Sequence, residues 1–329
     1  MDRLLCTLMK RNDRSVDKNM TREKLQKLIW DFSDDSPLNF LGENSGANAS
    51  EEDVNRNNYA KNNLQNKGAN PEMFRKEDFG EFEGMRFFEH PIFSITRADD
   101  PGFMVIKRPE VVGEHHLLPQ DWLPDAKSVI SVFMPYNHST VESNKKDDAV
   151  PSMQWLYTRV DGQRFLLALG ATIRDALVAD GHKAVTPYTE DKYIMQVSTD
   201  LKPGTEHVPP YSTNWSERHV GVVTGLGTFG LSTNFISRAG SAGRLISVVT
   251  DWDIEPDERD YDDWLGYCNR CGACIRRCQA KAHFSDRVGK DHGKCGAYIG
   301  KVCQPFRPRY GCGKCQSGVP CEYKPMKPE

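Results

Sequence analysis

The segment CNRCGACIRRC, residues 268–278, contains four cysteines separated by two, two and three residues. A cubane iron–sulfur cluster needs four converging thiolates. Closely spaced cysteines on a tight loop supply three of them, and the fourth comes from elsewhere in the chain. In proteins with two such clusters, the last cysteine of the run crosses to the other cluster. The spacing therefore predicts one cluster at this loop and requires further cysteines to complete a second.

The residues after this segment supply those cysteines and bring the total to eight. We predict two [4Fe–4S] clusters. The first is held by Cys268, Cys271, Cys274 and Cys321, and the second by Cys278, Cys295, Cys312 and Cys315.

The cysteine pattern departs from the bacterial one in two places. Gln279 stands where a proline usually follows, and five residues separate Cys315 from Cys321. Two zinc sites are the alternative, because they also use paired cysteines. Cys6 and Cys303 are left over, and we expect both to be free structural thiols.

The composition is that of a soluble globular protein, with 38% hydrophobic and 27% charged residues among 329. A net charge of −3 gives no argument for nucleic acid or an anionic membrane as a partner. No apolar run approaches the roughly 20 residues that a membrane span needs, and no export signal is evident. We therefore expect a cytoplasmic protein. In that compartment ten cysteines indicate metal or redox centres more than disulfides.

The chain before the cysteines divides into two parts. Residues 1–84 are polar, and the stretch 41–71 is rich in Asn, Gly, Ser and charge, which predicts an arm that is flexible or wraps the body. A short helix is expected at Arg22–Phe32 after a Thr21 cap. Regular order is expected to begin near Phe87.

Residues 85–262 carry the periodicity of a mixed body. The apolar run at 126–136 predicts a buried strand, and residues 183–188 and 244–254 predict two more. Helical spacing at 161–181, with Gly181 as its stop, predicts a long helix. We predict an α+β body, followed by a small basic, cysteine-rich module at 263–329.

Several motifs resemble those of two enzyme groups, the epoxyqueuosine reductases and the reductive dehalogenases. KCGAY (294–298) and YGCGKCQSGVPC (310–321), together with the first cysteine run, are similar to their double-cluster module. SERHVGVVTGLGTFGLSTNFIS (216–237), GRLISVVTD (243–251) and AKSVISVFMPY (126–136) resemble segments of their corrinoid domain. The resemblance covers about residues 85–329.

The resemblance implies a nitroreductase-like three-layer body that holds cobalamin, and a ferredoxin-like module that feeds it electrons. A low-potential donor such as ferredoxin or flavodoxin is the implied partner. The Gly-rich turn is compatible with cofactor binding, because glycines let backbone amides approach a ligand closely. Its candidate residues are Gly225, Leu226, Gly227, Thr228 and Gly230. A tight turn between two elements is the alternative.

The resemblance also marks Tyr211 as a candidate proton donor. Epoxyqueuosine reductases place an aspartate at this position and a lysine where Leu231 stands, and they continue into a helical-repeat tail that does not follow Cys321 here. Reductive dehalogenases use a tyrosine. These differences favour a small organic substrate over tRNA. The alternative for Tyr211 is a turn residue that packs after Pro209 and Pro210.

Other polar residues receive simpler predictions. Glu217 and Arg218 are expected to form a structural ion pair, while Asn214, Trp215 and His219 either line a pocket or pack. His115 and His116 are expected at the surface. Arg270, Arg276, Arg277 and Lys281 either form a solvated face or guide an acidic electron donor.

Three functions compete on the sequence. The first is a corrinoid and iron–sulfur reductase of a small organic molecule. The second is a two-cluster electron-transfer protein without corrinoid. The third is an epoxyqueuosine reductase that acts on tRNA.

Overall fold

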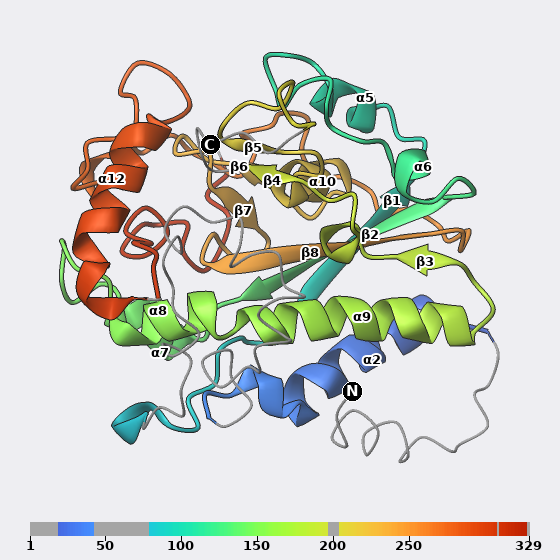
Figure 1. Cartoon of the computed structure of the whole chain (residues 1–329), viewed down its shortest axis with the longest axis horizontal. Coiled ribbons are helices and arrows are strands. Elements are labelled where there is room, and N and C mark those ends of the chain that lie inside the picture. The colour runs from blue at the N-terminus through green and yellow to red at the C-terminus, as the bar shows by residue number, and fades with distance from the viewer. Residues whose placement is uncertain (1–18, 43–78, 197–203, 308, 328–329) are drawn as a thin grey trace.

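The computed structural model describes residues 19–42, 79–196, 204–307 and 309–327. At the centre lies a four-stranded antiparallel sheet with strand order β1-β2-β8-β3 (Figure 1). Its strands are β1 (Ile92–Arg97), β2 (Ser128–Pro135), β8 (Gly243–Thr250) and β3 (Ala184–Val185). Two short hairpins add β4 (Met195–Gln196) with β5 (Ser212–Thr213) and β6 (Gly227–Phe229) with β7 (Phe235–Ser237).

Strand β2 forms the middle of the sheet and is buried along its whole length. It pairs with β1 on one side and with β8 on the other, where Ile130 faces Val248 and Val132 faces Ile246. A strand covered on both faces has no need for polar alternation, which explains its nearly continuous apolar sequence. The predicted strands at 126–136 and 244–254 are therefore confirmed, with slightly shorter bounds.

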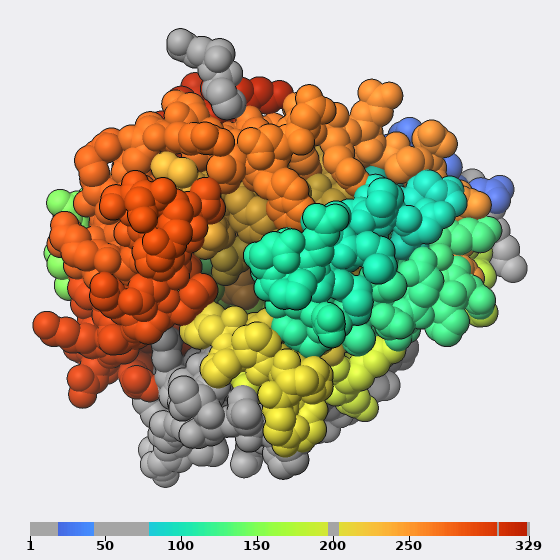
Figure 2. Space-filling view, turned by 90° about the horizontal axis from the view of Figure 1, so that it is seen from above, coloured from blue at the N-terminus to red at the C-terminus, as the bar shows by residue number. Residues whose placement is uncertain are grey.

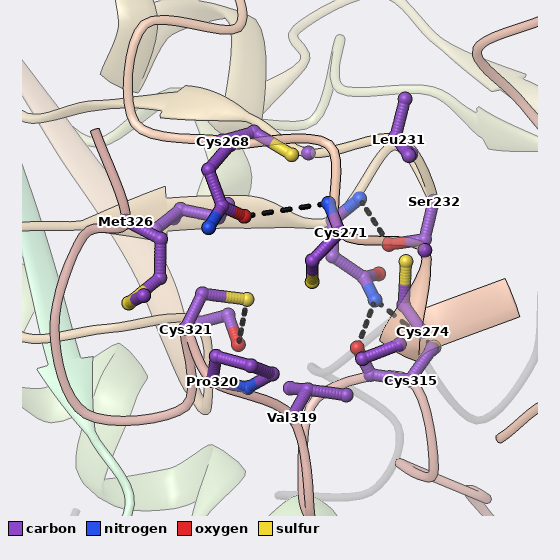
Figure 3. A pocket seen from close by; sticks show the side chains of 17 residues that line it. Leu231, Ser232, Cys268, Cys271, Cys274, Cys315, Val319, Pro320, Cys321 and Met326 are labelled. Atoms are coloured by element: carbon purple, nitrogen blue, oxygen red, sulfur yellow. Dashed lines mark hydrogen bonds between the residues drawn. The ribbon is translucent and has the colours of Figure 1, made fainter. Parts of the chain in front are cut away.

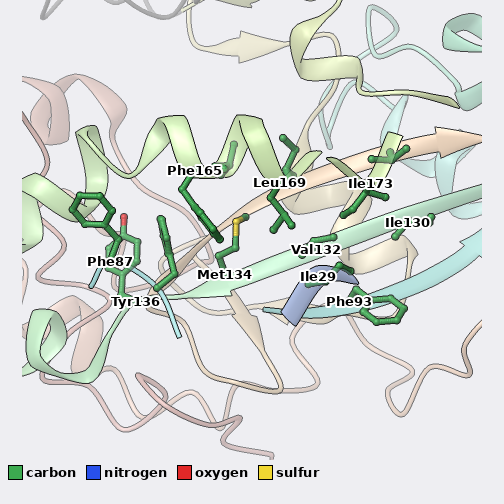
Figure 4. Packing of buried hydrophobic residues seen from close by; sticks show 14 of the residues in the cluster. Ile29, Phe87, Phe93, Ile130, Val132, Met134, Tyr136, Phe165, Leu169 and Ile173 are labelled. Carbon is green, nitrogen blue, oxygen red and sulfur yellow. The ribbon is translucent and has the colours of Figure 1, made fainter. Parts of the chain in front are cut away.

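Two helices cover one face of the sheet, α9 (Gln163–Ala179) and α2 (Arg22–Asp35) (Figure 1). The apolar side of α9 presents Phe165, Leu169 and Ile173 to β2, as Figure 4 shows. Helix α2 begins after Thr21, whose side chain accepts a hydrogen bond from the backbone N–H of Lys24 at 3.3 Å. Both predicted helices are confirmed, because their apolar residues recur at helical spacing.

The expectation that order begins near Phe87 is wrong. Leu25 and Ile29 of α2 are fully buried in the main core, and Leu41 joins them. This part of the polar N-terminal region therefore belongs to the body. Most of the Asn-rich stretch 41–71 lies outside the described residues.

The opposite face of the sheet is covered by short elements. They are α5 (Gly102–Ile106), α6 (Pro119–Trp122) and α10 (Glu217–Val223), and they surround the buried indole of Trp215. Helix α10 packs on β8 and β2, and the β6–β7 hairpin follows it directly. Three 3₁₀ turns lie elsewhere in the body, at Pro37–Asn39, Gly80–Phe82 and Pro187–Thr189. The last of them interrupts the strand predicted at 183–188, because Pro187 cannot donate to a sheet ladder.

The cysteine-rich region contains two helices, α11 (Ala273–Arg276) and α12 (His292–Val302), and a 3₁₀ turn at Gln304–Phe306. It docks against α7 (His138–Ser143) and α8 (Met153–Val160) of the body. Arg309 donates from Nε and Nη2 to both carboxylate oxygens of Asp161, at 2.8 and 3.1 Å, and both side chains are buried. The buried ammonium of Lys314 donates to the backbone carbonyls of Asn144 and Asp147.

The architecture is thus mixed helix and sheet with small antiparallel sheets, which confirms the α+β class. Its narrower description as nitroreductase-like with a ferredoxin-like module stays a prediction, as does the division of the chain into three parts. None of the helices in the described part of the chain has both the length and the apolar character that a membrane crossing requires.

Candidate functional site

The four cysteines predicted for the first cluster line one pocket. Cys268 and Cys271 come from the loop after Tyr267, Cys274 from α11, and Cys321 from the C-terminal loop (Figure 3). The two chain segments meet through a bridge between Cys268 and Met326, where the backbone N–H of Met326 donates to the carbonyl of Tyr267 at 2.9 Å. Residues about fifty positions apart in the sequence are therefore held around one space.

The chemistry of this pocket suits metal-bound thiolates. Apart from cysteines, its lining is apolar or small and polar, and no Asp, Glu, Lys, Arg or His is among the described residues that line it. Burial raises the pKa of the Cys321 thiol to about 12 and also raises that of Cys274. Thiolates at these positions are therefore unfavourable without a positive partner, and metal ligation supplies one while releasing the protons.

The second set of cysteines lies beside the first. Cys295 is on α12, and the nearby charges of Cys315 and Cys278 act on its thiol, while those of Cys315 and Cys295 act on Cys312. Burial is the largest cause that raises the pKa of Cys295, and it raises that of Cys312 to about 12. The structure thus brings the predicted second set into electrostatic contact.

Cys315 connects the two sets. It lines the first pocket, and its Sγ accepts a hydrogen bond from Nδ2 of Asn234 at 2.9 Å. Between Cys312 and Cys315, Gly313 has φ +68° and lies against Trp155, so that an added Cβ would stand 2.0 Å from the indole. The loop can follow this path only with glycine at that position.

The grouping of cysteines differs from a mononuclear metal site. Ligand sulfurs on one tetrahedral zinc lie about 4 Å apart, from a bond length of about 2.3 Å. In the described part of the chain, no three His, Cys, Asp or Glu side chains are close enough to hold a single ion. A cubane is a larger object with a ligand at each of four corners, and the shared pocket offers it the four predicted cysteines with Cys315 as a fifth. The assignment of individual ligands stays a prediction.

Of the two leftover cysteines, the structure describes Cys303. Cys303 is buried in a small apolar cluster with Leu156 and Tyr310, and its Sγ donates to the carbonyl of Gly311 at 3.8 Å. It is a packed thiol, as predicted. Cys6 lies outside the described residues.

A hollow opens in the surface beside the second set. Figure 2 shows it between the orange and red residues of the module, the yellow loop that precedes β5 and the teal segment that contains α5. Arg218 on α10 is exposed to solvent, yet desolvation by the surrounding protein lowers the pKa of its guanidinium. A side chain that is accessible to solvent and still desolvated by protein on several sides lies in a concave part of the surface. Charges on Tyr211 and Cys315 act on it, so both lie nearby.

Tyr211 directly precedes β5 and contacts the module. Its side chain is 52% exposed, and its ring lies 4.3 Å from the ring of His292, centroid to centroid, at an interplanar angle of 43°. His292 is the first residue of α12, which carries Cys295 one turn later. The contact across the hollow agrees with a turn residue that packs as well as with a proton donor, and geometry alone leaves both interpretations open.

Glu217 and Arg218 do not form the predicted ion pair, because adjacent residues at the start of α10 point in different directions. Arg218 donates from Nη1 to the carbonyl of Thr233 at 3.1 Å. Glu217 points inward toward Ser247. Burial raises the pKa of this carboxyl to about 7, and the polar groups of Ser247 only partly oppose the rise. Within the described residues neither carboxylate oxygen has a hydrogen-bonding partner of normal geometry.

The Gly-rich segment has local structural reasons for two of its glycines. Gly225 adopts φ +84° in the turn that ends α10. At Gly227 an added Cβ would lie 2.2 Å from the carbonyl oxygen of Ile236 across the β6–β7 hairpin. Leu226 and Thr228 are fully buried. Gly230 lines the cysteine pocket. The turn therefore shapes the wall of the first cysteine set, and its role in corrinoid binding stays a prediction.

The histidines near α10 differ from expectation. His116 is fully buried, not on the surface, and stacks on Trp215 while its Nε2 accepts from the backbone N–H of Ser216 at 3.0 Å. Burial lowers the pKa of His116 to about 3 and that of His219 likewise to about 3. The sequence around His116 contains no pattern that predicts its burial, because its stacking partner Trp215 lies about a hundred residues further along the chain.

The basic residues near the cysteines divide into two kinds. Arg277 is structural, since it donates to the carbonyl of Ser317 at 2.7 Å and pairs with Asp148. Arg270, Arg276 and Lys281 are exposed. Arg276 donates from Nη1 to the carbonyl of Cys271 at 2.9 Å, and Cys271 is the one exposed cysteine among those described.

Comparison with family models gives no match, and no curated protein matches the chain. Among solved structures, the chain is similar to the catabolic reductive dehalogenase NpRdhA in complex with 3-bromo-4-hydroxybenzoic acid, at 14% identity and a TM-score of 0.46, over 71% of this chain and 30% of that one. It is similar to epoxyqueuosine reductase from Streptococcus thermophilus at 18% identity and a TM-score of 0.42, over 72% and 65% of the two chains. The enzyme from Bacillus subtilis gives 16% identity and a TM-score of 0.44 over the same shares.

The solved structures named here are those of a reductive dehalogenase and of epoxyqueuosine reductases. The chain spans less than a third of the dehalogenase and about two thirds of the epoxyqueuosine reductases. At these identities and TM-scores the matches assign no substrate and no cofactor.

Proposed function

We propose that the chain is a reductase that passes low-potential electrons through two [4Fe–4S] clusters to a corrinoid bound in the hollow, where a small organic molecule is reduced. The observation that carries this proposal is the arrangement of eight cysteines in two adjoining sets, one of which lies beside Arg218 and Tyr211. A redox chain that ends at an open, polar hollow is what a reductase needs.

The positions of the two sets give the electron path a direction. The first set reaches the surface at Cys271, while the second set adjoins the hollow through Cys315 and α12. Electrons would enter at the first set and leave from the second. Cys315 lines the first pocket as well, so the two clusters would be close neighbours.

We expect the hollow to bind a ligand with polar groups. Arg218 is open to it and still has donor capacity beyond its bond to Thr233, and α10 with the β6–β7 hairpin forms a rigid support behind it. When bound, a corrinoid supplies a strongly reducing cobalt centre. The protein's own residues would hold that group, exclude water from the reaction and deliver a proton.

Tyr211 is suited to the delivery of that proton. A phenol has a pKa of about 10 and stays protonated at neutral pH until a developing anion takes its proton. The positive charge of Arg218 acts on Tyr211, and it would stabilise the phenolate that remains.

The electron donor would dock where Cys271 is exposed. Residues 263–329 contain thirteen Lys or Arg and five Asp or Glu, a net charge of +8 in a chain of −3. Such a basic module favours encounter with an acidic carrier protein such as a ferredoxin or flavodoxin. Arg270 and Arg276 flank the exposed cysteine and are the residues we propose for this contact.

Metal and cofactor analysis of anaerobically purified protein tests the proposal. We expect about eight irons and eight sulfides per chain. After reconstitution we also expect one cobalt, with cobalamin bands in the visible spectrum. Stoichiometric zinc with little iron would overturn the cluster assignment. Full cluster content without cobalamin binding at micromolar concentration would instead favour the two-cluster electron-transfer protein.

A further inference from the structure

We infer that His292 is a positioning residue that holds the ring of Tyr211 at the hollow. The inference rests on the proposed function, in which Tyr211 donates the proton. It adds a residue of the cysteine module to the reaction site, one that is not itself a predicted cluster ligand.

The geometry that carries the inference is the contact between the two rings. Their centroids are 4.3 Å apart at an interplanar angle of 43°, slightly closer than the roughly 4.5–7 Å typical of aromatic pairs, so the two rings are in direct contact. The two residues come from different parts of the chain, since Tyr211 directly precedes β5 and His292 begins α12. The charge of Arg218 on α10 acts on both of them, so three separate elements meet here.

The strand pairing that follows Tyr211 is short. Strands β4 and β5 pair over only two residues each, and the phenol is 52% exposed. A half-exposed side chain on a short hairpin samples several rotamers unless a neighbour restricts it. A general acid that is misplaced by about 1 Å can lose as much as a hundredfold in rate, so the restriction has functional weight.

Helix α12 is a rigid base for this support. At its start, the side chain of Asp291 caps the helix by accepting from the backbone N–H of Lys294 at 2.9 Å. Further along, the hydroxyl of Tyr298 donates to the carbonyl of Ala149 in the body at 2.8 Å, and Ile299 packs in the cluster around Leu156. The imidazole of His292 therefore projects from a helix fixed to the body at its far end.

The ring contact, and not proton transfer, is the role we assign to His292. Burial, with Lys290 and Arg218, lowers the pKa of the imidazole to about 4, so the ring is neutral when it packs against the phenol. An aromatic ring without ring nitrogens should therefore replace it.

The test compares His292→Ala and His292→Phe with wild type, each in the cluster-loaded protein. Lys294→Ala is the matched control, because the side chain of Lys294 is exposed on the same turn of α12 and its ammonium lies 3.8 Å from the carboxylate of Asp291, while the capping bond from its backbone N–H is kept. Hydrogen–deuterium exchange of residues 204–215, measured anaerobically by mass spectrometry, reports the order of the Tyr211 segment without any need for turnover. Iron content and cobalamin binding are measured on each sample.

We expect exchange in this segment to be roughly two- to tenfold faster in His292→Ala, the range that follows from the loss of one aromatic contact. His292→Phe and Lys294→Ala should exchange as wild type does. Once a reducible substrate is known, kcat should fall at least about tenfold in His292→Ala and return to within about twofold in His292→Phe.

Unchanged exchange in His292→Ala would overturn the inference, and so would a Phe variant as impaired as the Ala variant. A protein that loads clusters but binds no cobalamin would refute the proposed function. The exchange result would then still decide whether His292 orders the Tyr211 segment, so the two failures are distinguishable.

Discussion

Replacement of Tyr211 by Phe separates a proton donor from a packing residue. The substitution keeps the ring that contacts His292 at 4.3 Å and removes only the hydroxyl. Because the side chain is 52% exposed, water can replace any hydrogen bond that the hydroxyl makes. The cost in stability should therefore stay at or below about 1 kcal/mol. Cluster content and cobalamin binding should not change.

The rate should behave differently. A general acid contributes roughly 10²–10⁴ in rate, or about 3–5 kcal/mol of transition-state stabilisation. The assay compares steady-state rates of wild type and Tyr211→Phe at equal cobalt loading, with any reducible substrate. A Phe variant within about threefold of wild type, well short of the general-acid range, would refute the assignment. The proton would then come from water or from another residue of the hollow.

Three further predictions concern the clusters and the stability of the fold. A variant lacking both Cys278 and Cys312 should lose about half of the iron, and full iron content would contradict the predicted second set. Glu217→Gln should stabilise the protein at pH 8 but not at pH 4.5. Burial raises the pKa of Glu217 to about 7, so the folded state keeps a proton that the unfolded state releases near pH 4.5. The stability of the wild type therefore falls as the pH rises from about 4.5 to 7, by at most about 3 kcal/mol. Thermal unfolding of both proteins at pH 4.5 and pH 8 measures the difference, and an equal change in melting temperature at the two pH values would contradict the prediction. Asp161→Asn should cost about 3–5 kcal/mol in chemical unfolding, because it removes the negative charge opposite the buried guanidinium of Arg309; a cost below about 1 kcal/mol would show that the pair does not hold the module to the body.

Local patterns in the sequence were sufficient for the regular elements. The apolar run of β2 and the helical spacing of α9 each depend on residues that are neighbours in the chain, and the Thr21 cap acts over three residues. The cysteine spacing is equally local for Cys268, Cys271 and Cys274, which is why it predicts that they gather at one pocket.

Predictions failed where burial depends on distant partners. Helix α2 is polar on average and looked like part of an arm, but Leu25 and Ile29 reach the main core. The adjacent Glu217 and Arg218 were expected to pair. The helix instead turns one toward Ser247 and leaves the other in the hollow. No sequence pattern predicted a role for His292, because its partner Tyr211 lies in another segment of the chain.

The sequence by itself determined which elements form and which residues can bind metal, because hydrophobic periodicity and cysteine spacing act over a few residues. The tertiary structure alone decided that Cys321 returns to the first loop, that Cys315 lies beside both sets and near Arg218, and that Tyr211 meets His292. These contacts join segments that lie tens of residues apart. The buried pairs of Asp161 with Arg309 and of Lys314 with Asn144 join the module to the body, and no local pattern encodes that docking.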